Sequence, residues 1–219
     1  MVRHFLCWLF LLGITACSQS APPPPPVAPP PVALDANALC LQDLTRMGVA
    51  FQSVQPFTQP NNSGCGIDNP VKVTATLIPW NRPAVLSCDL ARTMVKFEQD
   101  VVLPLAQRQF GQGISQFQHA GTYDCRVQRN NSTNGGTKAG RLSEHAKGLA
   151  IDISGYKLAD GTMLSVKGDW RGQGKKSLFL REMARSACST FHVVLSPNYD
   201  KYHQDHVHVD LGQYSLCGS

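Results

Sequence analysis

The sequence predicts an α+β domain in which a small antiparallel sheet is flanked by helices. Segments with the two-residue period of strands and segments with the helical period follow one another, and none of them repeats. The helical segments come before and between short strands, an order typical of the α+β class. With 219 residues, 42% of them hydrophobic, the chain can form one such domain with appendages.

Three segments are expected to be helical. The first covers residues 38–47, where leucines recur at helical spacing, and Gly48 ends it. The second follows Ser87, which can cap a helix, and Pro104 should kink it or end it. The third covers residues 175–191, in which large apolar side chains lie on one stripe.

The strands are expected where short apolar runs occur, and loops where turn residues gather. Strands are predicted over residues 70–77, 149–153, 193–196 and 206–211, and turns or loops over residues 61–65, 81–83 and 130–140. In the last strand Val207 and Val209 should face the core. His206 and His208 should then share the opposite face.

The N-terminus is typical of an export signal. A short basic start precedes an apolar run over residues 5–14, too short to span a bilayer, and Cys17 follows in a motif that resembles a bacterial lipobox. We therefore expect residues 1–16 to be a lipoprotein signal peptide, with an ordinary cleaved signal as the alternative. Ser18 after the lipidated Cys17 points to the outer membrane, facing the periplasm.

Residues 17–33 are expected to be the lipidated cysteine and a proline-rich tether. Prolines fill residues 22–26 and 29–31, and such a stretch favours an extended polyproline II form of about 3.1 Å per residue. This tether would hold the globular domain, residues 34–219, away from the membrane.

Six of the eight cysteines lie in that domain, and export predicts that they form disulfides. They are Cys40, Cys65, Cys88, Cys125, Cys188 and Cys217. Of fifteen possible pairings, sequential pairing closes the shortest loops, so Cys40–Cys65, Cys88–Cys125 and Cys188–Cys217 are expected. No C-x2-C pair is present, which argues against a cysteine-rich zinc site.

The charge pattern gives no sign of a nucleic-acid partner. The formal net charge is +5, but the basic residues are scattered, with Lys175-Lys176 as their longest run. Proteins that bind nucleic acids usually gather positive charge on one face. A mildly basic surface suits an anionic cell-wall polymer equally well.

Two distant segments carry the residues expected to do chemistry. His145 and Asp152 form a His-x6-Asp pair around Gly148, and His206 and His208 share one strand face more than fifty residues later. Two imidazoles and one carboxylate are the ligands of a catalytic zinc ion with an open fourth position. We therefore predict a zinc site on the sheet and a hydrolase. Asp210 lies on the same face, where it either holds a ligand imidazole or is a solvated strand end.

These segments resemble a known zinc site. Ser143-x-His145-x-x-Gly148-x-Ala150-Ile151-Asp152, followed by Asp205-His206-x-His208, is similar to the pattern of the D-alanyl-D-alanine carboxypeptidase and hedgehog-type metallopeptidase superfamily. Tyr123-Asp124-Cys125-Arg126 and Leu195-Ser196-Pro197-Asn198-Tyr199-Asp200 resemble the bacterial extensin-like C-terminal domain family more closely. The resemblance covers residues 34–219.

The resemblance implies a role for each matching residue. His145, Asp152 and His208 would bind zinc, Asp205 would be the catalytic acid and base, and His206 would steady the oxyanion. Arg126 would meet a substrate carbonyl or carboxylate, unless it is only a surface arginine, and Ser143 would orient substrate or a ligand. His203 is expected to be a loop residue, with a place beside the ligands as the alternative. His119 and His192 are expected to be structural.

The resulting expectation is a zinc-dependent peptidoglycan peptidase that cleaves cross-links between stem peptides. The alternatives are a zinc-stabilised wall-binding module without turnover, a D,D-carboxypeptidase and a structural wall protein. The sequence does not distinguish D,D from L,D cleavage. The expected partners are peptidoglycan and, through the lipid, a membrane.

Overall fold

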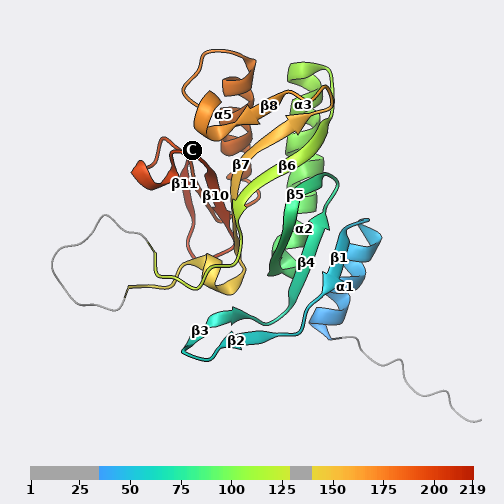
Figure 1. Cartoon of the computed structure of the whole chain (residues 1–219), viewed down its shortest axis with the longest axis vertical. Coiled ribbons are helices and arrows are strands. Elements are labelled where there is room, and N and C mark those ends of the chain that lie inside the picture. The colour runs from blue at the N-terminus through green and yellow to red at the C-terminus, as the bar shows by residue number, and fades with distance from the viewer. Residues whose placement is uncertain (1–34, 129–139) are drawn as a thin grey trace, which may run out of the picture. The chain divides into compact units, whose positions relative to one another are not determined.

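The strands of this protein form a sheet that is larger than expected and mixed. The computed structural model describes residues 35–128 and 140–219 (Figure 1). The sheet contains β1 (Ala50–Ser53), β4 (Pro70–Ala75), β5 (Pro79–Ser87), β6 (Ile114–Gly121), β7 (Ala150–Leu158), β8 (Met163–Ser165), β9 (Val193–Leu195), β10 (Val207–Asp210) and β11 (Leu216–Gly218). Its order is β1-β4-β5-β6-β7-β10-β9-β11, with β8 paired to β7. The expected export signal, lipidated Cys17 and proline tether, and residues 130–139 of the expected loop, lie outside the described residues.

The α+β class is confirmed, but the expectation of a small antiparallel sheet is wrong. The sheet has nine strands, and two pairs, β5–β6 and β9–β11, run parallel. The first parallel pair arises because helices connect β5 to β6, the kind of crossover that parallel strands require. The register between β6 and β7 shifts near Gln116 and His119.

Two expected loops are part of strands. Residues 81–83 lie inside β5, where the pairing with β4 is irregular between Val73 and Ala75, so Pro83 is tolerated there. Residues 62–65 belong to β3 (Asn62–Ile67), which pairs with β2 (Phe57–Gln59) in a separate hairpin.

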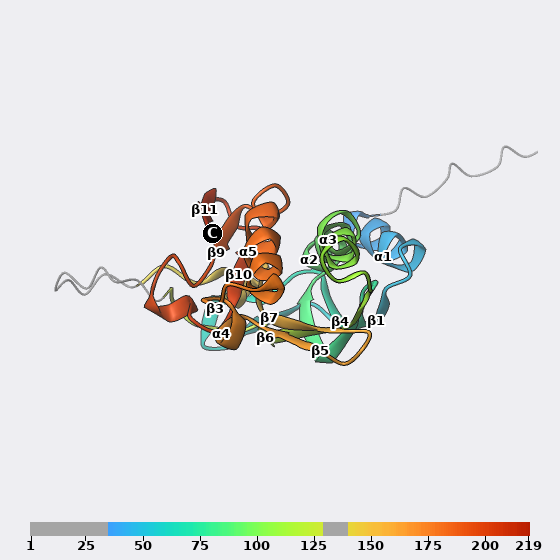
Figure 2. The same cartoon turned by 90° about the horizontal axis from the view of Figure 1, so that it is seen from above.

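The helices form where capping residues precede amphipathic segments. Asp35 caps α1 (Ala36–Arg46), and Ser87 caps α2 (Cys88–Phe97), as expected for the latter. A π-helical turn, η1 (Glu98–Val102), leads into α3 (Leu103–Phe110), and α4 (Val166–Asp169) and α5 (Lys175–Ala187) follow later. In Figure 2, α2, α3 and α5 lie on one side of the strands β4 to β7. Over the described residues, no helix has the length and apolar character needed to cross a bilayer.

The helical path does not end at Pro104, which was one of the two outcomes expected for this residue. It lies in the first turn of α3, where its missing N–H costs little, and η1 absorbs the change in hydrogen bonding before it. The helical path ends at Gly111, whose φ is 70°.

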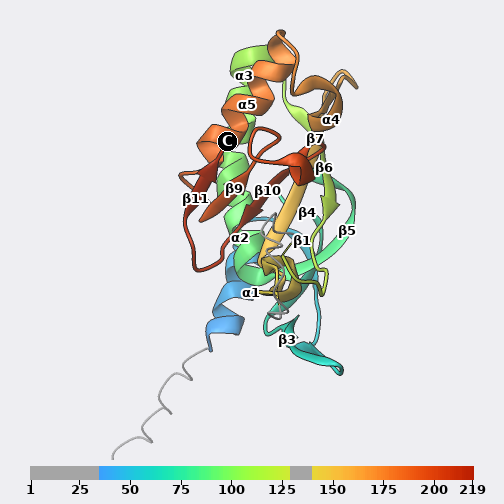
Figure 3. The ribbon, with the colours of Figure 1, turned by 90° about the vertical axis from the view of Figure 1, so that its left-hand side faces the viewer.

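The core lies between the helices and the sheet. Val207 and Val209 are fully buried, as expected for the core face of β10. Figure 3 shows β9 between β10 and β11. The opposite face of β10 is therefore left for the histidines.

Three disulfides join the described cysteines, and one of them matches the expected pairing. Cys188–Cys217 is confirmed, but Cys40 pairs with Cys88 and Cys65 with Cys125, so the other two expected bonds are wrong. Loop length is a weak criterion, since doubling a loop costs only about 0.6 kcal/mol. The pairing follows instead from which elements are in contact. Helix α1 packs on α2, which brings Cys40 to Cys88, and the β2–β3 hairpin meets the segment before Arg126, which brings Cys65 to Cys125.

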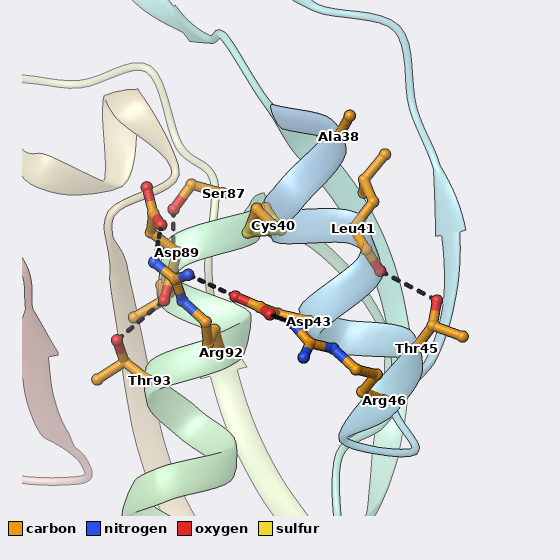
Figure 4. Close-up of a disulfide and its surroundings, with 12 residues drawn as sticks. Ala38, Cys40, Leu41, Asp43, Thr45, Arg46, Ser87, Asp89, Arg92 and Thr93 are labelled. Carbon is orange, nitrogen blue, oxygen red and sulfur yellow. Dashed lines mark hydrogen bonds and ion pairs between the residues drawn. A yellow bond between two sulfur atoms is a disulfide. The ribbon is translucent and has the colours of Figure 1, made fainter. Parts of the chain in front are cut away.

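Ion pairs support the contact between α1 and α2. Arg92 of α2 lies 2.9 Å from Asp43 of α1 and 2.7 Å from Asp89, beside the Cys40–Cys88 bond (Figure 4). Arg46 also contacts Asp43. These ion pairs lie at the surface of the two helices and orient α1 relative to α2 without burying a charge.

A buried carboxyl group lies in η1 beneath the sheet. Glu98 is fully buried, and it accepts hydrogen bonds from the Thr76 hydroxyl at 2.6 Å and the Leu77 N–H at 2.9 Å. Burial raises its pKa from 4.5 to about 8, against the smaller effect of these hydrogen bonds. The side chain is therefore neutral in the folded protein below that pH.

We expect Glu98 to make stability depend on pH. Because its folded pKa lies above its unfolded pKa, its contribution is complete below pH 4.5 and is lost as the pH rises through about 8. At roughly 1.4 kcal/mol per pKa unit, the loss is on the order of several kcal/mol. Thermal melting of the wild type and of Glu98→Gln should therefore diverge between pH 5 and 9, with the variant the more stable at high pH.

The Glu182→Gln variant of α5, whose side chain is half-buried, is the control, and its melting temperature should follow that of the wild type at every pH. A constant difference between the wild type and Glu98→Gln over this range would contradict the prediction.

Candidate metal centre

The first candidate ligand is held by a short 3-10 turn, η2 (Glu144–Lys147). Ser143 precedes this turn as its N-cap, and its hydroxyl accepts from the His145 N–H at 3.4 Å. Gly148 ends the turn with a φ of 65°, and a Cβ there would lie 2.4 Å from Ile67 Cδ1. Glycine is therefore needed on both conformational and steric grounds. Ser143, expected to orient substrate or a ligand, is buried and orients the segment carrying His145.

The second and third candidate ligands face each other across two strands. Asp152 of β7 and His208 of β10 are directly paired in antiparallel register. The buried His145 reaches the same point from η2. The structure thus brings together the three predicted zinc ligands from three separate elements.

Three ligand atoms converge on one point. His145 Nε2 lies 3.2 Å from Asp152 Oδ1 and 3.1 Å from His208 Nδ1, and His208 Nδ1 lies 3.1 Å from Asp152 Oδ1. In tetrahedral zinc sites with bonds of about 2.0–2.1 Å, neighbouring ligand atoms lie about 3.3 Å apart. The triangle has the size that such an ion requires, and this grouping is the one found among the described residues.

Hydrogen bonds on the outer side of each ring determine which nitrogen faces inward. His145 Nδ1 contacts the Thr122 carbonyl oxygen, which only accepts, so this nitrogen carries the hydrogen. His208 Nε2 lies 3.0 Å from Asp210 Oδ2 and donates to it. In their neutral forms the two rings therefore turn unprotonated nitrogens inward, where these lone pairs meet a carboxylate oxygen. Such a set of donors fits a divalent cation.

Asp210 holds the imidazole of the candidate ligand His208, in agreement with the first of its two expected alternatives. It is 5% exposed, and its Oδ1 accepts from the Gly212 N–H at 2.8 Å. A solvated strand end is therefore excluded. Metal-binding histidines commonly donate their second N–H to such a carboxylate.

The electrostatics of the triangle also favour a bound cation. Burial opposes ionisation of Asp152, but hydrogen bonds with His145 and His208 outweigh it and hold the pKa well below 3.8. Burial likewise disfavours a charged His208, yet hydrogen bonds with Asp152 and Asp210 raise its pKa to about 9. Without a metal, a proton on His208 supplies the positive charge that the two carboxylates require.

His206 and Asp205 lie beside the triangle in the turn before β10. His206 Nε2 is 3.5 Å from Asp152 Oδ1, and its Nδ1 is 2.8 Å from Asp205 Oδ1. The Asp205 side chain is 61% exposed and reaches the centre through His206. Its expected position at a bend is confirmed, because β10 begins at Val207.

Arg126 lines the same cavity as the three ligands, which has a volume of about 1010 Å³. Its Nε is 3.0 Å from Asp124 Oδ2, and its carbonyl accepts from the Ser143 N–H at 3.0 Å. The Cys65–Cys125 bond immediately precedes it. The structure therefore places Arg126 at the site rather than on an unrelated surface.

Sequence reasoning missed one contributor to the site and gave another second place. His203 was expected to be a loop residue, with a place beside the ligands as the alternative. The structure favours the alternative, because its side chain is 14% exposed, its Nδ1 lies 2.7 Å from Asp200 Oδ1, and its ring centroid is 5.2 Å from that of His206. The spacing His203-x-x-His206-x-His208 was the available signal. The Thr122 carbonyl gave no signal, because a backbone acceptor carries no residue signature. His119 and His192 make backbone contacts, as expected of structural histidines.

Comparison with known families finds one that covers most of the chain. The family described as Extensin-like protein C-terminus matches residues 38–218. No curated protein and no solved structure matches the chain.

Proposed function

The chain belongs to the extensin-like protein C-terminus family, and we propose that it is a zinc-dependent peptidase that cleaves peptide cross-links of peptidoglycan. The observation that carries the proposal is the triangle of His145, Asp152 and His208, whose atoms lie 3.1–3.2 Å apart. We also propose that the site belongs to the D-alanyl-D-alanine carboxypeptidase and hedgehog-type metallopeptidase superfamily, on the residues that resemble it.

Hydrolysis of an amide needs an electrophile, a route for a proton and a place for the oxyanion. A zinc ion with three protein ligands would polarise a carbonyl and lower the pKa of bound water to about 7. Water adds to the carbonyl carbon, the C–N bond breaks, and a proton from water ends on the leaving amine. The residues of this chain must therefore hold the ion, move that proton and place the substrate.

His206 and Asp205 are proposed to move the proton as a pair. Asp205 accepts from His206 Nδ1 and fixes the ring, while Nε2 faces the centre near Asp152. In this arrangement Nε2 meets the water or the oxyanion, and the Asp205 carboxylate balances the charge on the ring. Arg126 is proposed to bind a substrate carbonyl, since it lines the cavity beside the ligands.

Peptidoglycan is proposed as the substrate because of where the chain is expected to work. An export signal with a lipidated Cys17 and a proline tether would place the domain on the outer membrane, facing the cell wall in the periplasm. The three disulfides agree with an oxidising compartment. The cavity of about 1010 Å³ is large enough for a stretch of peptide.

A zinc-stabilised wall-binding module without turnover is the second candidate. The exposed carboxylate of Asp205 favours it, because this residue does not touch the triangle directly. A D,D-carboxypeptidase would use the same centre and differ in its product.

Defined cross-linked muropeptides distinguish these functions. We expect the zinc-loaded protein to convert dimers to monomers, seen by mass spectrometry, to stop when a chelator removes the metal, and to resume when zinc returns. Release of D-alanine alone would indicate a carboxypeptidase. Binding to purified sacculi at full zinc occupancy with no product would select the wall-binding module and reject the peptidase.

A further inference from the structure

One wall of the cavity is a short two-stranded ribbon that the fold presents beside the metal centre. Val127 and Leu142 form an antiparallel bridge, the Gln128 N–H donates to the Arg141 carbonyl at 2.8 Å, and the Ser143 N–H donates to the Arg126 carbonyl. Side chains alternate along a strand, so the neighbours of Val127 and Leu142 point to the face opposite to these two residues. Arg126, Gln128, Arg141 and Ser143 all line the cavity.

On the other face of this ribbon, Leu142 packs against the β2–β3 hairpin, whereas Val127 is 48% exposed. A Cβ on Gly64 would lie 2.5 Å from Leu142 Cδ1, which shows how closely the β2–β3 hairpin meets the ribbon. The Cys65–Cys125 bond ties the hairpin to one strand, and Ser143 at the end of the other strand caps η2. The two arginines are therefore held toward the cavity by backbone structure.

Arg141 is further oriented by an aromatic ring. Its guanidinium carbon lies 3.8 Å from the ring centroid of Tyr214, which also lines the cavity and is 58% exposed. A guanidinium stacked on a ring keeps its N–H donors at its edge, where they bind a carboxylate with two parallel hydrogen bonds. An aromatic face thus leaves the edge of Arg141 available for an anion.

The nearby acids do not neutralise Arg141 fully. Its Nη2 is 3.5 Å from Glu144 Oε1, a long contact, and Glu144 also lies 3.4 Å from Lys147 Nζ. One buried carboxylate is therefore shared by two cations. Arg141, Lys147 and Glu144 together keep one positive charge, so the guanidinium of Arg141 is not fully neutralised.

The register of the ribbon gives the subsite a position. Arg141 lies two residues before Ser143, so its row is about 7 Å along the ribbon from the row of Arg126 and Ser143. An extended peptide covers that distance in about two residues. With Arg126 binding the carbonyl at the cleaved bond, as proposed above, a group bound by Arg141 belongs to a residue about two positions from that bond.

We infer that Arg141, stacked on Tyr214, forms a carboxylate-binding subsite, and that the protein takes anionic peptides with a free carboxylate about two residues from the cleaved bond. This inference rests on the proposed function for the position of that bond. It predicts that stem peptides whose carboxylates are amidated bind poorly.

The test is the binding of two tetrapeptides to the zinc-loaded protein by calorimetry. Both are L-Ala-γ-D-Glu-meso-diaminopimelyl-D-Ala with the same C-terminus, but one has the carboxylates of its second and third residues amidated. We expect the free form to bind about tenfold more tightly, and Arg141→Gln to remove this preference. Arg141→Lys should restore only part of it, because lysine lacks the planar fork.

Arg108→Gln is the matched control, since Arg108 lies on α3 and pairs with Glu182 at 2.6 Å, away from the cavity lining. It should retain the full preference. Zinc content and melting temperature of Arg141→Gln should equal those of the wild type. Equal binding of the two peptides by the wild type, no binding of either, or an unchanged preference in Arg141→Gln overturns the inference.

The same proteins assayed on cross-linked muropeptides separate the inference from the proposed function. Cleavage with no preference for free carboxylates keeps the peptidase and rejects the subsite. A binding preference that depends on Arg141, with no cleavage of any muropeptide, keeps the subsite and rejects the peptidase.

Discussion

Asp152→Asn is expected to lower the affinity for zinc at least about a thousandfold and to abolish hydrolysis. Asparagine keeps the shape of aspartate but removes the negative charge that His145 and His208 share through Oδ1. The site would then offer two neutral imidazoles and a neutral amide to a divalent ion. Equilibrium competition with a coloured chelator measures the affinity, and muropeptide digestion measures the activity.

Two further aspartates give a graded comparison. Asp210→Asn weakens the hydrogen bond to His208 Nε2 without removing a ligand, so zinc affinity should fall about 10–100-fold. Asp160→Asn changes an exposed residue that pairs with Gln112, and it should leave zinc affinity unchanged. All three variants are isosteric, so differences among them report position rather than size.

The order of these effects is the decisive result. If Asp152→Asn bound zinc as tightly as Asp160→Asn while remaining folded, the triangle would not be the metal centre. If Asp152→Asn lost zinc but still cleaved muropeptides, the metal would be dispensable and the proposed mechanism would be wrong.

The sequence predicted the candidate ligands through the spacing of His145 and Asp152, the alternation around His208 and the resemblance of both segments to a known zinc site. Alternation placed His206 and His208 opposite Val207 and Val209, and both valines are buried as expected. A strand period depends on neighbouring residues alone, so it can be read without knowledge of the partner strand.

Contacts between distant segments could not be predicted in the same way. The order of the nine strands, the parallel pair β5–β6 and the Cys65–Cys125 bond depend on which surfaces meet, and no local pattern encodes that. The orientation of His145 by the Thr122 carbonyl belongs to the same class. Asp205 is an example within the site. Its position three residues before His208 could be seen in the sequence, but its contact with His206 could not be predicted.

The Cys65–Cys125 bond is expected to support both the fold and the metal centre. It joins the β2–β3 hairpin to the segment that carries the Thr122 carbonyl and Arg126, and Phe57 packs edge-on against Tyr123 at 5.1 Å in the same contact. The Asp124 N–H also donates to the His145 carbonyl at 3.2 Å. Without the disulfide, the segment from Thr122 to Arg126 would be less restrained, and His145 would lose support both at its ring and at its backbone carbonyl.

Replacing both cysteines by serine should cost about 4 kcal/mol of stability, the chain-entropy estimate for a separation of 60 residues. The melting temperature should fall by about 10 °C for a domain of this size. Zinc affinity, measured well below the melting temperature, should fall about 10–100-fold, because the orienting contact of His145 is weakened.

The Cys40–Cys88 bond provides the matched control. Its separation of 48 residues predicts nearly the same loss of stability, but it joins α1 to α2 and touches none of the three ligands (Figure 4). Cys40→Ser with Cys88→Ser should therefore lower the melting temperature by a similar amount and leave zinc affinity unchanged. An equal loss of zinc affinity in both double variants would mean that the Cys65–Cys125 bond acts through overall stability alone, and that the hairpin does not position His145.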